Sequence, residues 1–374
     1  GESPPGAAGP MSSNNALFCA SQATMSVSIS VFLFEGFAYN IIFLGRILPA
    51  VGKSALITPF AVVFNLIWGL AIWSYFKAHA SDPGVVPKKW QEFVRGVGDA
   101  LPVAPARPEW QPGKATYCKK CNIPRPERSH HCLVCEVCVL RMDHHCPWIN
   151  NCVGFNNHKF FLLLGIYTWM ASAVWVVTAL PELFYFAQAV TRLEDGRDWK
   201  ATEALEMSEV WVFLASGTMA ATVALLLSSL LATHAPLATR NLTTIEDFYE
   251  NMPNPYDQGG RKENLAQVFG AVGLDWLLPV RPWRPLADGV TYPHAGERDA
   301  YNRMYEDSNQ SAYAAIASFY TDDEDTEVEK NWRLRYGVRT PMSPDSKGSV
   351  NPLTLHFWVC GRPQGVRGTS DGCP

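Results

Sequence analysis

Residues 118–152 read CKKCNIPRPERSHHCLVCEVCVLRMDHHCPWINNC and hold seven of the ten cysteines in the 374-residue chain, together with four histidines. Thiolate and imidazole are the ligands that zinc prefers, and a Cys-x2-Cys spacing directs two sulfurs to one metal ion. Two tetrahedral zinc sites need about eight ligands, so this stretch offers more candidates than two ions use. Its composition indicates a metal-stabilised segment with side chains left for other chemistry.

Four apolar blocks surround this stretch, two before it and two after it. They cover residues 25–48, 55–76, 160–186 and 210–233. A helix needs about 20 apolar residues to cross the hydrocarbon core of a bilayer. Buried helices of soluble proteins are shorter and carry charge on one face. We therefore predict an all-α membrane protein with four transmembrane helices. Glu35, inside the first block, is either a functional intramembrane charge or a residue near the interface.

The connecting segments differ in charge, and this difference predicts the orientation. Residues 77–159 hold twelve Lys or Arg, whereas residues 191–209 hold three basic and six acidic residues. Because basic loops stay in the cytosol, we expect the 77–159 loop there, residues 187–209 on the lumenal or extracellular side, and both termini in the cytosol. No charged region precedes the first span, so a cleaved signal peptide is not expected. Disulfides are rare in the reducing cytosol, which favours metal binding or catalysis for the clustered cysteines.

Four motifs carry a family resemblance. Asp143-His144-His145-Cys146 and the surrounding residues 118–152 resemble the cysteine-rich domain of the DHHC protein palmitoyltransferases. The other motifs are Asp82-Pro83-Gly84, similar to the DPG motif; Thr243-Thr244-Ile245-Glu246, similar to TTxE; and the segment from Asn254 through Asn264 to Gly270, similar to the PaCCT motif. The resemblance covers residues 25–280 and implies a cytosolic, zinc-stabilised DHHC domain between the second and third spans, at about 116–159.

The resemblance also implies two structural zinc ions. One set of ligands would be Cys118, Cys121, His131 and Cys138, and the other Cys132, Cys135, His145 and Cys152. In a segment with little regular structure, zinc binding would supply the folding free energy. This assignment uses six of the seven cysteines and leaves Cys146. The alternative is that Cys146 is itself a further zinc ligand in a domain that only binds.

The family reaction has two thioester exchanges. Cys146 would attack acyl-CoA, the co-substrate, and the acyl group would then pass to a cysteine of a membrane-associated protein. A thiol attacks as thiolate, so it needs a base. His144 would be that base and Asp143 its orienting partner. Arg125, Arg128 and Arg141 would meet the coenzyme A phosphates, or else be solvated surface charges.

Two other functions remain open from the residues alone. One is a membrane-anchored zinc module that binds partners without catalysis, and the other is a thiol oxidoreductase with a redox-active Cys-x2-Cys. The expected partners are the lipid bilayer, acyl-CoA and membrane proteins with a cytosolic cysteine, and no nucleic acid. The Golgi is the expected compartment, with the endoplasmic reticulum or plasma membrane as alternatives.

The expected termini complete the domain plan. Residues 1–24 would form an N-terminal cytosolic segment, residues 234–285 a cytosolic region with the TTxE and PaCCT motifs, and residues 286–374 a disordered tail. The acidic run 321–330 would be solvated. Cys19, Cys360 and Cys373 lack partner spacing and are read as free thiols or lipidation sites.

Overall fold

The computed structural model describes residues 13–194, 205–294 and 326–339. Four apolar helical stretches in it are long enough to cross a membrane: Ala16–Ala50, Ser54–Ala80, His158–Thr191 and Met207–Thr239. They consist of α1 (Ser13–Phe37), the π-helix η1 (Ala38–Ile47) and α2 (Leu48–Ala50); η2 (Ser54–Leu56) and α3 (Ile57–Ala80); α5 (His158–Glu194); and α6 (Met207–Thr239). The four predicted spans are confirmed, and each extends beyond its predicted ends, by one to nine residues.

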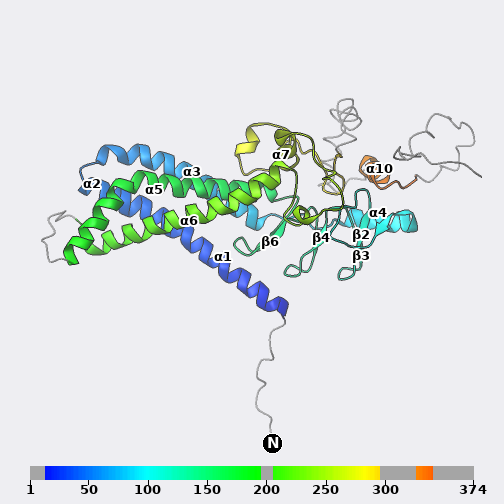
Figure 1. Cartoon of the computed structure of the whole chain (residues 1–374), viewed down its shortest axis with the longest axis horizontal. Helices are drawn as coiled ribbons and strands as arrows, with labels where there is room; N and C mark the ends of the chain where they lie inside the picture. Colours follow the sequence, from blue (N-terminus) through cyan, green and yellow to red (C-terminus); the bar gives the residue numbers. More distant parts are fainter. Residues whose placement is uncertain (1–12, 195–204, 295–325, 340–374) are drawn as a thin grey trace, which may run out of the picture. The chain divides into compact units, whose positions relative to one another are not determined.

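The four spans form a bundle in which α5 contacts both α3 and α6 (Figure 1). Its centre is aromatic: the Tyr39 ring stacks on Phe64 with centroids 3.8 Å apart, and Phe43 stacks on Phe213 at 5.7 Å. Offset ring stacking adds about 0.5–1.5 kcal/mol per pair beyond burial. Large aliphatic side chains such as Leu225, 73% exposed, point outward. An apolar exterior around a packed core is what a lipid-facing bundle requires.

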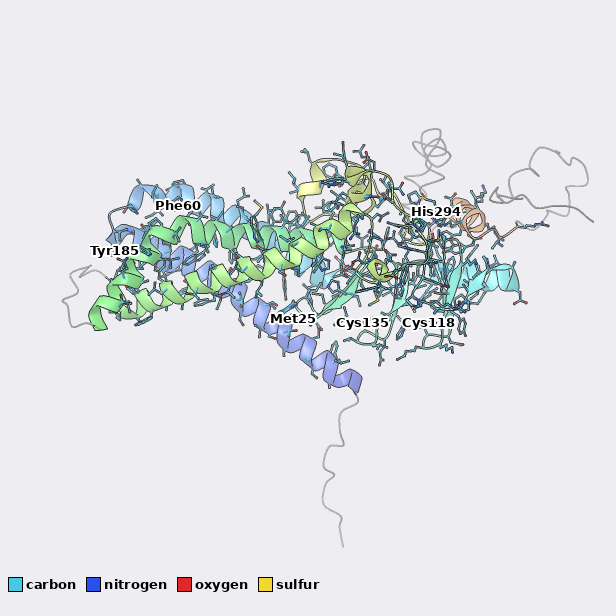
Figure 2. The ribbon with its side chains drawn as sticks, viewed as in Figure 1. Met25, Phe60, Cys118, Cys135, Tyr185 and His294 are labelled. Carbon is cyan, nitrogen blue, oxygen red and sulfur yellow. The ribbon has the colours of Figure 1, made fainter. Side chains whose placement is uncertain are left out.

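Three small β-sheets build the segment between α3 and α5. After α4 (Lys88–Val97) and η3 (Gly98–Ala100) come β1 (Val103–Ala104), β2 (Ala115–Cys118), β3 (Ile123–Arg125), β4 (His130–His131), β5 (Cys138–Val139), β6 (His144–Cys146) and β7 (Asn151–Val153). Their order is β1-β2-β3, β4-β5 and β6-β7, with β1 parallel to β2 and the other pairs antiparallel. The spans are helical as expected, whereas the cysteine-rich segment is a series of short hairpins, and Figure 2 shows Cys118 and Cys135 within it.

The C-terminal region contains η4 (Glu246–Phe248), α7 (Arg261–Phe269), η5 (Leu274–Leu277) and α10 (Thr326–Arg335). The expected disorder from residue 286 onward is wrong for residues 286–294 and 326–339. Trp332 of α10 is buried against Trp90 and Phe93 of α4, with ring centroids 5.6 Å and 5.4 Å apart. The acidic run 321–330 led us to expect a solvated tail, and it gave no sign of this aromatic contact.

Several expectations fall outside the described residues. These are the first twelve residues of the N-terminal segment, residues 195–204 of the loop between α5 and α6, residues 321–325 of the acidic run, Cys360 and Cys373.

Candidate active site and metal centres

The structure brings together both expected sets of zinc ligands. In each set all four ligand atoms lie within 4.8 Å of one another: Cys118, Cys121, His131 and Cys138 in one, and Cys132, Cys135, His145 and Cys152 in the other. A tetrahedral zinc with ordinary bond lengths places its ligand atoms about 3.6–3.8 Å apart. The sulfurs of Cys138 and Cys121 are 3.6 Å apart, and those of Cys152 and Cys135 are 3.5 Å apart. Both sets therefore fit structural zinc.

Hairpin register places the ligands. His131 pairs with Cys138 across β4 and β5, and His145 pairs with Cys152 across β6 and β7. Side chains of directly paired residues lie on the same side of a sheet. Each zinc set thus obtains two ligands from one hairpin and two from a Cys-x2-Cys turn. In the second turn the Cys135 backbone N–H lies 3.3 Å from the Cys132 sulfur.

Strand alternation separates zinc binding from the candidate nucleophile. Successive side chains of a strand point to opposite faces. In β6, His145 therefore faces the second zinc set, while His144 and Cys146 share the other face. The three-residue strand β6 therefore presents one expected metal ligand, His145, on one face and two expected catalytic residues, His144 and Cys146, on the other.

Asp143 and His144 form a tight pair. The carboxylate Oδ2 of Asp143 lies 2.5 Å from His144 Nδ1. Burial disfavours the charged imidazole, but hydrogen bonds with Asp143 and Cys146 outweigh it and raise the pKa of His144 to about 9. Burial would also favour neutral Asp143, yet the hydrogen bond from His144 holds the pKa of that carboxyl well below its usual range. The structure thus brings the two residues expected as orienting carboxylate and base within hydrogen-bond distance of each other.

The TTxE motif holds Asp143 from the other side. The Thr244 backbone N–H donates to Asp143 Oδ1 at 2.7 Å, and the Thr244 hydroxyl donates to Oδ2 at 3.0 Å. Sequence reasoning missed His234 of α6, whose Nδ1 lies 3.7 Å from Asp143 Oδ2. A histidine inside an apolar span is a signal that could have found it.

Cys146 lies where the hairpins meet the bundle. It is buried in a cluster with Ala78 of α3, Phe160 and Phe161 of α5, and Phe269 of α7. Its partner on β7, Asn151, donates from its side chain to the backbone oxygens of residues 78, 79 and 81 at the end of α3. The thiol is therefore next to apolar surface continuous with the spans.

The structure corrects the expectation for two of the three arginines. Arg128 is bonded to both carboxylate oxygens of Glu246 at 2.7 Å, and both side chains are 1% exposed. Arg141 is also buried and donates to the Asn241 side chain at 2.8 Å. Arg128 stacks over the Tyr256 ring as well, 4.5 Å from its centroid. These guanidinium groups join the cysteine-rich segment to the TTxE and PaCCT regions and are not available to a phosphate.

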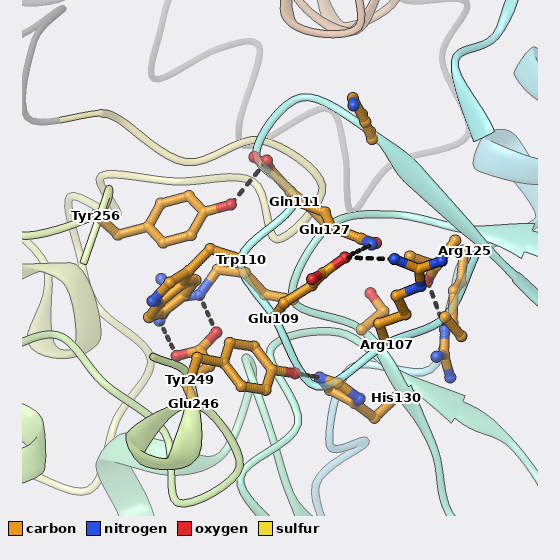
Figure 3. A pocket seen from close by; sticks show the side chains of 15 residues that line it. Arg107, Glu109, Trp110, Gln111, Arg125, Glu127, His130, Glu246, Tyr249 and Tyr256 are labelled. Carbon is orange, nitrogen blue, oxygen red and sulfur yellow. Dashed lines mark hydrogen bonds and ion pairs between the residues drawn. The ribbon is translucent and has the colours of Figure 1, made fainter. Parts of the chain in front are cut away.

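Arg125 lines a pocket near this junction (Figure 3). The pocket and the open solvent at its mouth together occupy about 420 Å³, and its basic lining includes Arg107, Lys114 and Arg125. Its carboxylates are paired: Glu127 accepts from Tyr256 and from Arg335 of the tail. The Tyr249 hydroxyl lies toward His130, at 3.5 Å. Sequence reasoning missed Glu127, because nothing in its neighbourhood marks it as buried.

The remaining motif residues form hydrogen bonds that join separate backbone segments. Asp82 Oδ1 accepts from the N–H groups of Gly84 and Val85, both at 2.8 Å, and the carbonyl of Gly84 accepts from Leu140 at 2.7 Å. Gly84 has φ +103°, which favours glycine. The carbonyl of Pro83 accepts from the N–H of residue 156 at 3.3 Å. The DPG turn thereby attaches the end of α3 to the cysteine-rich segment.

Three further motif residues make bonds of the same kind. Thr243 and Glu246 bond each other's backbone N–H with their side chains, at 3.3 Å and 2.9 Å. Asn264 donates to the carbonyl of Thr239, at the end of α6, at 3.0 Å. Glu35 is buried within the bundle.

A membrane bundle carrying a cysteine, histidine and aspartate beside two zinc-type clusters defines a class of thiol-dependent membrane enzyme. The family model described as "DHHC palmitoyltransferase" matches residues 111–251. The chain is 34% identical to "Probable protein S-acyltransferase 13" of Arabidopsis thaliana over 263 residues, which are 68% of this chain and 83% of the relative.

Further relatives agree with this match. "Probable protein S-acyltransferase 12" of Arabidopsis thaliana is 36% identical, over 61% of this chain and 75% of the relative. "Palmitoyltransferase ZDHHC20" of Homo sapiens is 32% identical, over 63% of this chain and 66% of the relative. The chain belongs to the DHHC palmitoyltransferase family and is a multi-pass membrane enzyme of the protein S-acyltransferase class.

Proposed function

We propose that this enzyme transfers a long acyl chain from acyl-CoA to the Cys146 sulfur and then to a cysteine of a membrane-associated protein. The observation that carries the proposal is the setting of Cys146. On β6 its side chain shares a face with that of His144, which hydrogen-bonds Asp143, and Cys146 is buried in one cluster with apolar side chains of α3, α5 and α7. No other described cysteine outside the two zinc sets has such neighbours, since Cys19 is exposed.

Each step exchanges one thioester for another. In the first step the Cys146 proton passes to His144 Nε2 and the thiolate attacks the acyl carbonyl. The bond to the CoA sulfur breaks, and the imidazolium protonates the leaving thiolate. In the second step a substrate thiol gives its proton to His144 and attacks the acyl-enzyme, which restores the Cys146 thiol. Asp143 keeps the imidazole in the tautomer with its Nδ1 proton and stabilises the imidazolium.

The two zinc ions would be structural. Each set offers four protein ligands, enough to fill a tetrahedral zinc, so the ions would supply folding free energy and would shape β6. Two zinc ions per chain by elemental analysis would exclude the oxidoreductase alternative, because the Cys-x2-Cys pairs would then be metal ligands.

The apolar surroundings of Cys146 suit the acyl chain. Transfer of a chain from water to lipid contributes about 0.8 kcal/mol per CH2. A long chain would therefore lie among the spans with its thioester at the thiol. We place the cysteine-rich segment and both termini on the cytosolic side because of the basic 77–159 loop, with the Golgi as the membrane in which to look first.

The coenzyme A phosphates would bind at Arg125 and Lys114 in the pocket of Figure 3. These are the basic residues of its lining for which no ion pair is recorded among the described residues, and the pocket shares Glu246 with the TTxE segment that holds Asp143. Replacing both with glutamine should raise KM for palmitoyl-CoA with little change in kcat. Lys119→Gln, a substitution on the next turn, is the control. An unchanged KM in the double variant would remove these two residues from the site.

The central test is labelling with radioactive palmitoyl-CoA in detergent micelles. We expect hydroxylamine-sensitive label in the wild type and in Cys19→Ser, and none in Cys146→Ser. Label that persists in Cys146→Ser would contradict the assignment of the nucleophile. A folded, zinc-loaded wild type that takes no label at any chain length would instead support a binding module without catalysis.

A further inference from the structure

The first helix is longer than a bilayer crossing needs. The continuous apolar stretch Ala16–Ala50 has 35 residues, and at 1.5 Å per residue it is about 50 Å long. The hydrocarbon core is only about 30 Å thick. Part of α1 therefore lies beyond the hydrocarbon core, at the end of the bundle where β6 is found.

One side chain in the first turns of α1 is covered while its neighbours are not. Ser21 is 2% exposed, whereas residues 16–20 and 22–23 are all exposed. The cover comes from β6: Ser21 Oγ lies 3.2 Å from Nε2 of His145. One turn further on, the Thr24 hydroxyl lies 2.8 Å from the carbonyl oxygen of Pro147. Two contacts therefore meet the residues immediately before and after Cys146.

The contact with His145 has a defined direction. His145 Nδ1 faces the second zinc set, 3.7 Å from the Cys132 sulfur, 3.4 Å from Cys135 and 3.8 Å from Cys152. An imidazole that ligates a metal through Nδ1 carries its proton on Nε2, so His145 donates to the Ser21 oxygen. Metal-bound histidines are commonly oriented by such a bond from the second nitrogen, and its loss typically costs about 10–100-fold in metal affinity or activity.

We propose that Ser21 is a positioning residue that ties the first transmembrane helix to the second zinc site and thereby fixes β6 at Cys146. The hydroxyl holds the ring plane of His145, and Thr24 holds the turn at Pro147. Neither residue touches the reacting atoms. The inference rests on the proposed zinc ligation and on Cys146 as nucleophile, and the experiment below separates the two.

The test measures zinc release and acyl transfer on the full chain in detergent micelles. Zinc passing to a chromogenic chelator is followed in wild type, Ser21→Ala and Ser21→Thr. In Ser21→Ala we expect one of the two zinc ions to leave about tenfold faster and the labelling of Cys146 to slow by a similar factor. Ser21→Thr keeps a hydroxyl and should restore both. Ser26→Ala is the matched control, because Ser26 bonds only a carbonyl of its own helix and is exposed.

Each outcome decides the matter. Zinc release from Ser21→Ala at the wild-type rate from both sites would overturn the inference, even if labelling of Cys146 proceeds as proposed. Faster release together with an unlabelled wild type would leave the inference standing and defeat the proposed reaction. If Ser21→Ala does not fold, Thr24→Val is the second variant: slower labelling with normal zinc release is expected, and unchanged labelling counts against the attachment of β6 to α1.

Discussion

The membrane bundle and the cysteine-rich segment are built on opposite principles. In the bundle, Phe43, Phe64, Phe213 and their neighbours pack as apolar rings, and the exterior is apolar. In the cysteine-rich segment, structure depends on particular atoms: eight metal-type ligands and the buried pair of Arg128 and Glu246. The bundle should therefore tolerate substitutions of similar volume, whereas the cysteine-rich segment should fail when one donor is removed.

Cys146, the proposed nucleophile, lies where these two regions meet. Cys146 is on a hairpin shaped by the zinc ligands, yet its buried neighbours belong to α3, α5 and α7. The zinc-type ligands fix the strand that carries the proposed nucleophile and base, and the bundle offers an apolar surface to the acyl chain. In the proposed reaction the two regions therefore have different roles.

The largest difference between the two regions is expected when one zinc ligand is removed. Cys135→Ser should release zinc from the second set, which supplies about 10–16 kcal/mol in zinc-dependent peptides, and unfold the hairpins. Elemental analysis should show at most one zinc per chain, and limited proteolysis should cut between residues 130 and 152. Leu44→Met, a swap of similar volume in the core of the bundle, is expected to cost about 1.5 kcal/mol or less and is the matched control. Two zincs retained in Cys135→Ser would contradict the assigned ligand set.

Asp143→Asn should lower the rate of Cys146 labelling by about 10²–10⁴-fold while leaving both zinc ions bound. The pH profile supplies the mechanistic reading. His144 must be neutral to accept the Cys146 proton, and because its pKa is raised to about 9, labelling should become faster as the pH rises toward that value. Removing the Asp143 charge lowers this pKa, so this acidic limb of the profile should move to lower pH in the variant. A limb that stays in place would show that another group controls it.

Arg128→Gln tests the buried ion pair. Leaving Glu246 charged, buried and unpaired should cost about 3–5 kcal/mol and detach the TTxE segment from Asp143. A fall in melting temperature should accompany slower labelling. Arg240→Gln, which breaks the exposed pair with Asp247, is the control and should change the melting temperature little. Equal effects of the two substitutions would show that burial does not set the cost.

Trp332→Ala tests the contact of α10 with α4, where the smallest effect on the whole protein is expected. Truncating a buried tryptophan in a protein core costs about 3–5 kcal/mol. Here the lost packing should detach α10 from α4, and the bundle should remain folded. Protease sensitivity of residues 326–338 should rise while both zincs remain. Leu334→Ala, at an exposed position of the same helix, should have no such effect. Unchanged protection in Trp332→Ala would mean that the ion pair of Arg335 with Glu127 is sufficient.

The sequence could predict whatever depends on composition and spacing. Four spans follow from long apolar blocks, because a bilayer demands about 20 such residues regardless of their partners. Cysteine and histidine spacing, which is local, predicts a metal-binding segment, and the two particular sets of zinc ligands were implied by the resemblance to a known family. The roles of Arg128 and Arg141 could not be predicted in this way. Whether an arginine faces solvent or a buried carboxylate depends on Glu246 and Asn241, which are about 100 residues away along the chain.

The membrane class of this protein and its metal-binding segment could therefore be read from the sequence, and the resemblance to a known family pointed to the thiol of Cys146. Only the tertiary structure decided what surrounds that thiol: Thr244 on Asp143, His234 from α6, Ser21 of α1 on the zinc ligand, and α10 folded against α4. The physical reason is range. Hydropathy and ligand spacing act over a few turns of chain, whereas buried hydrogen bonds and ring contacts join groups that the sequence separates and only packing brings within 3–6 Å.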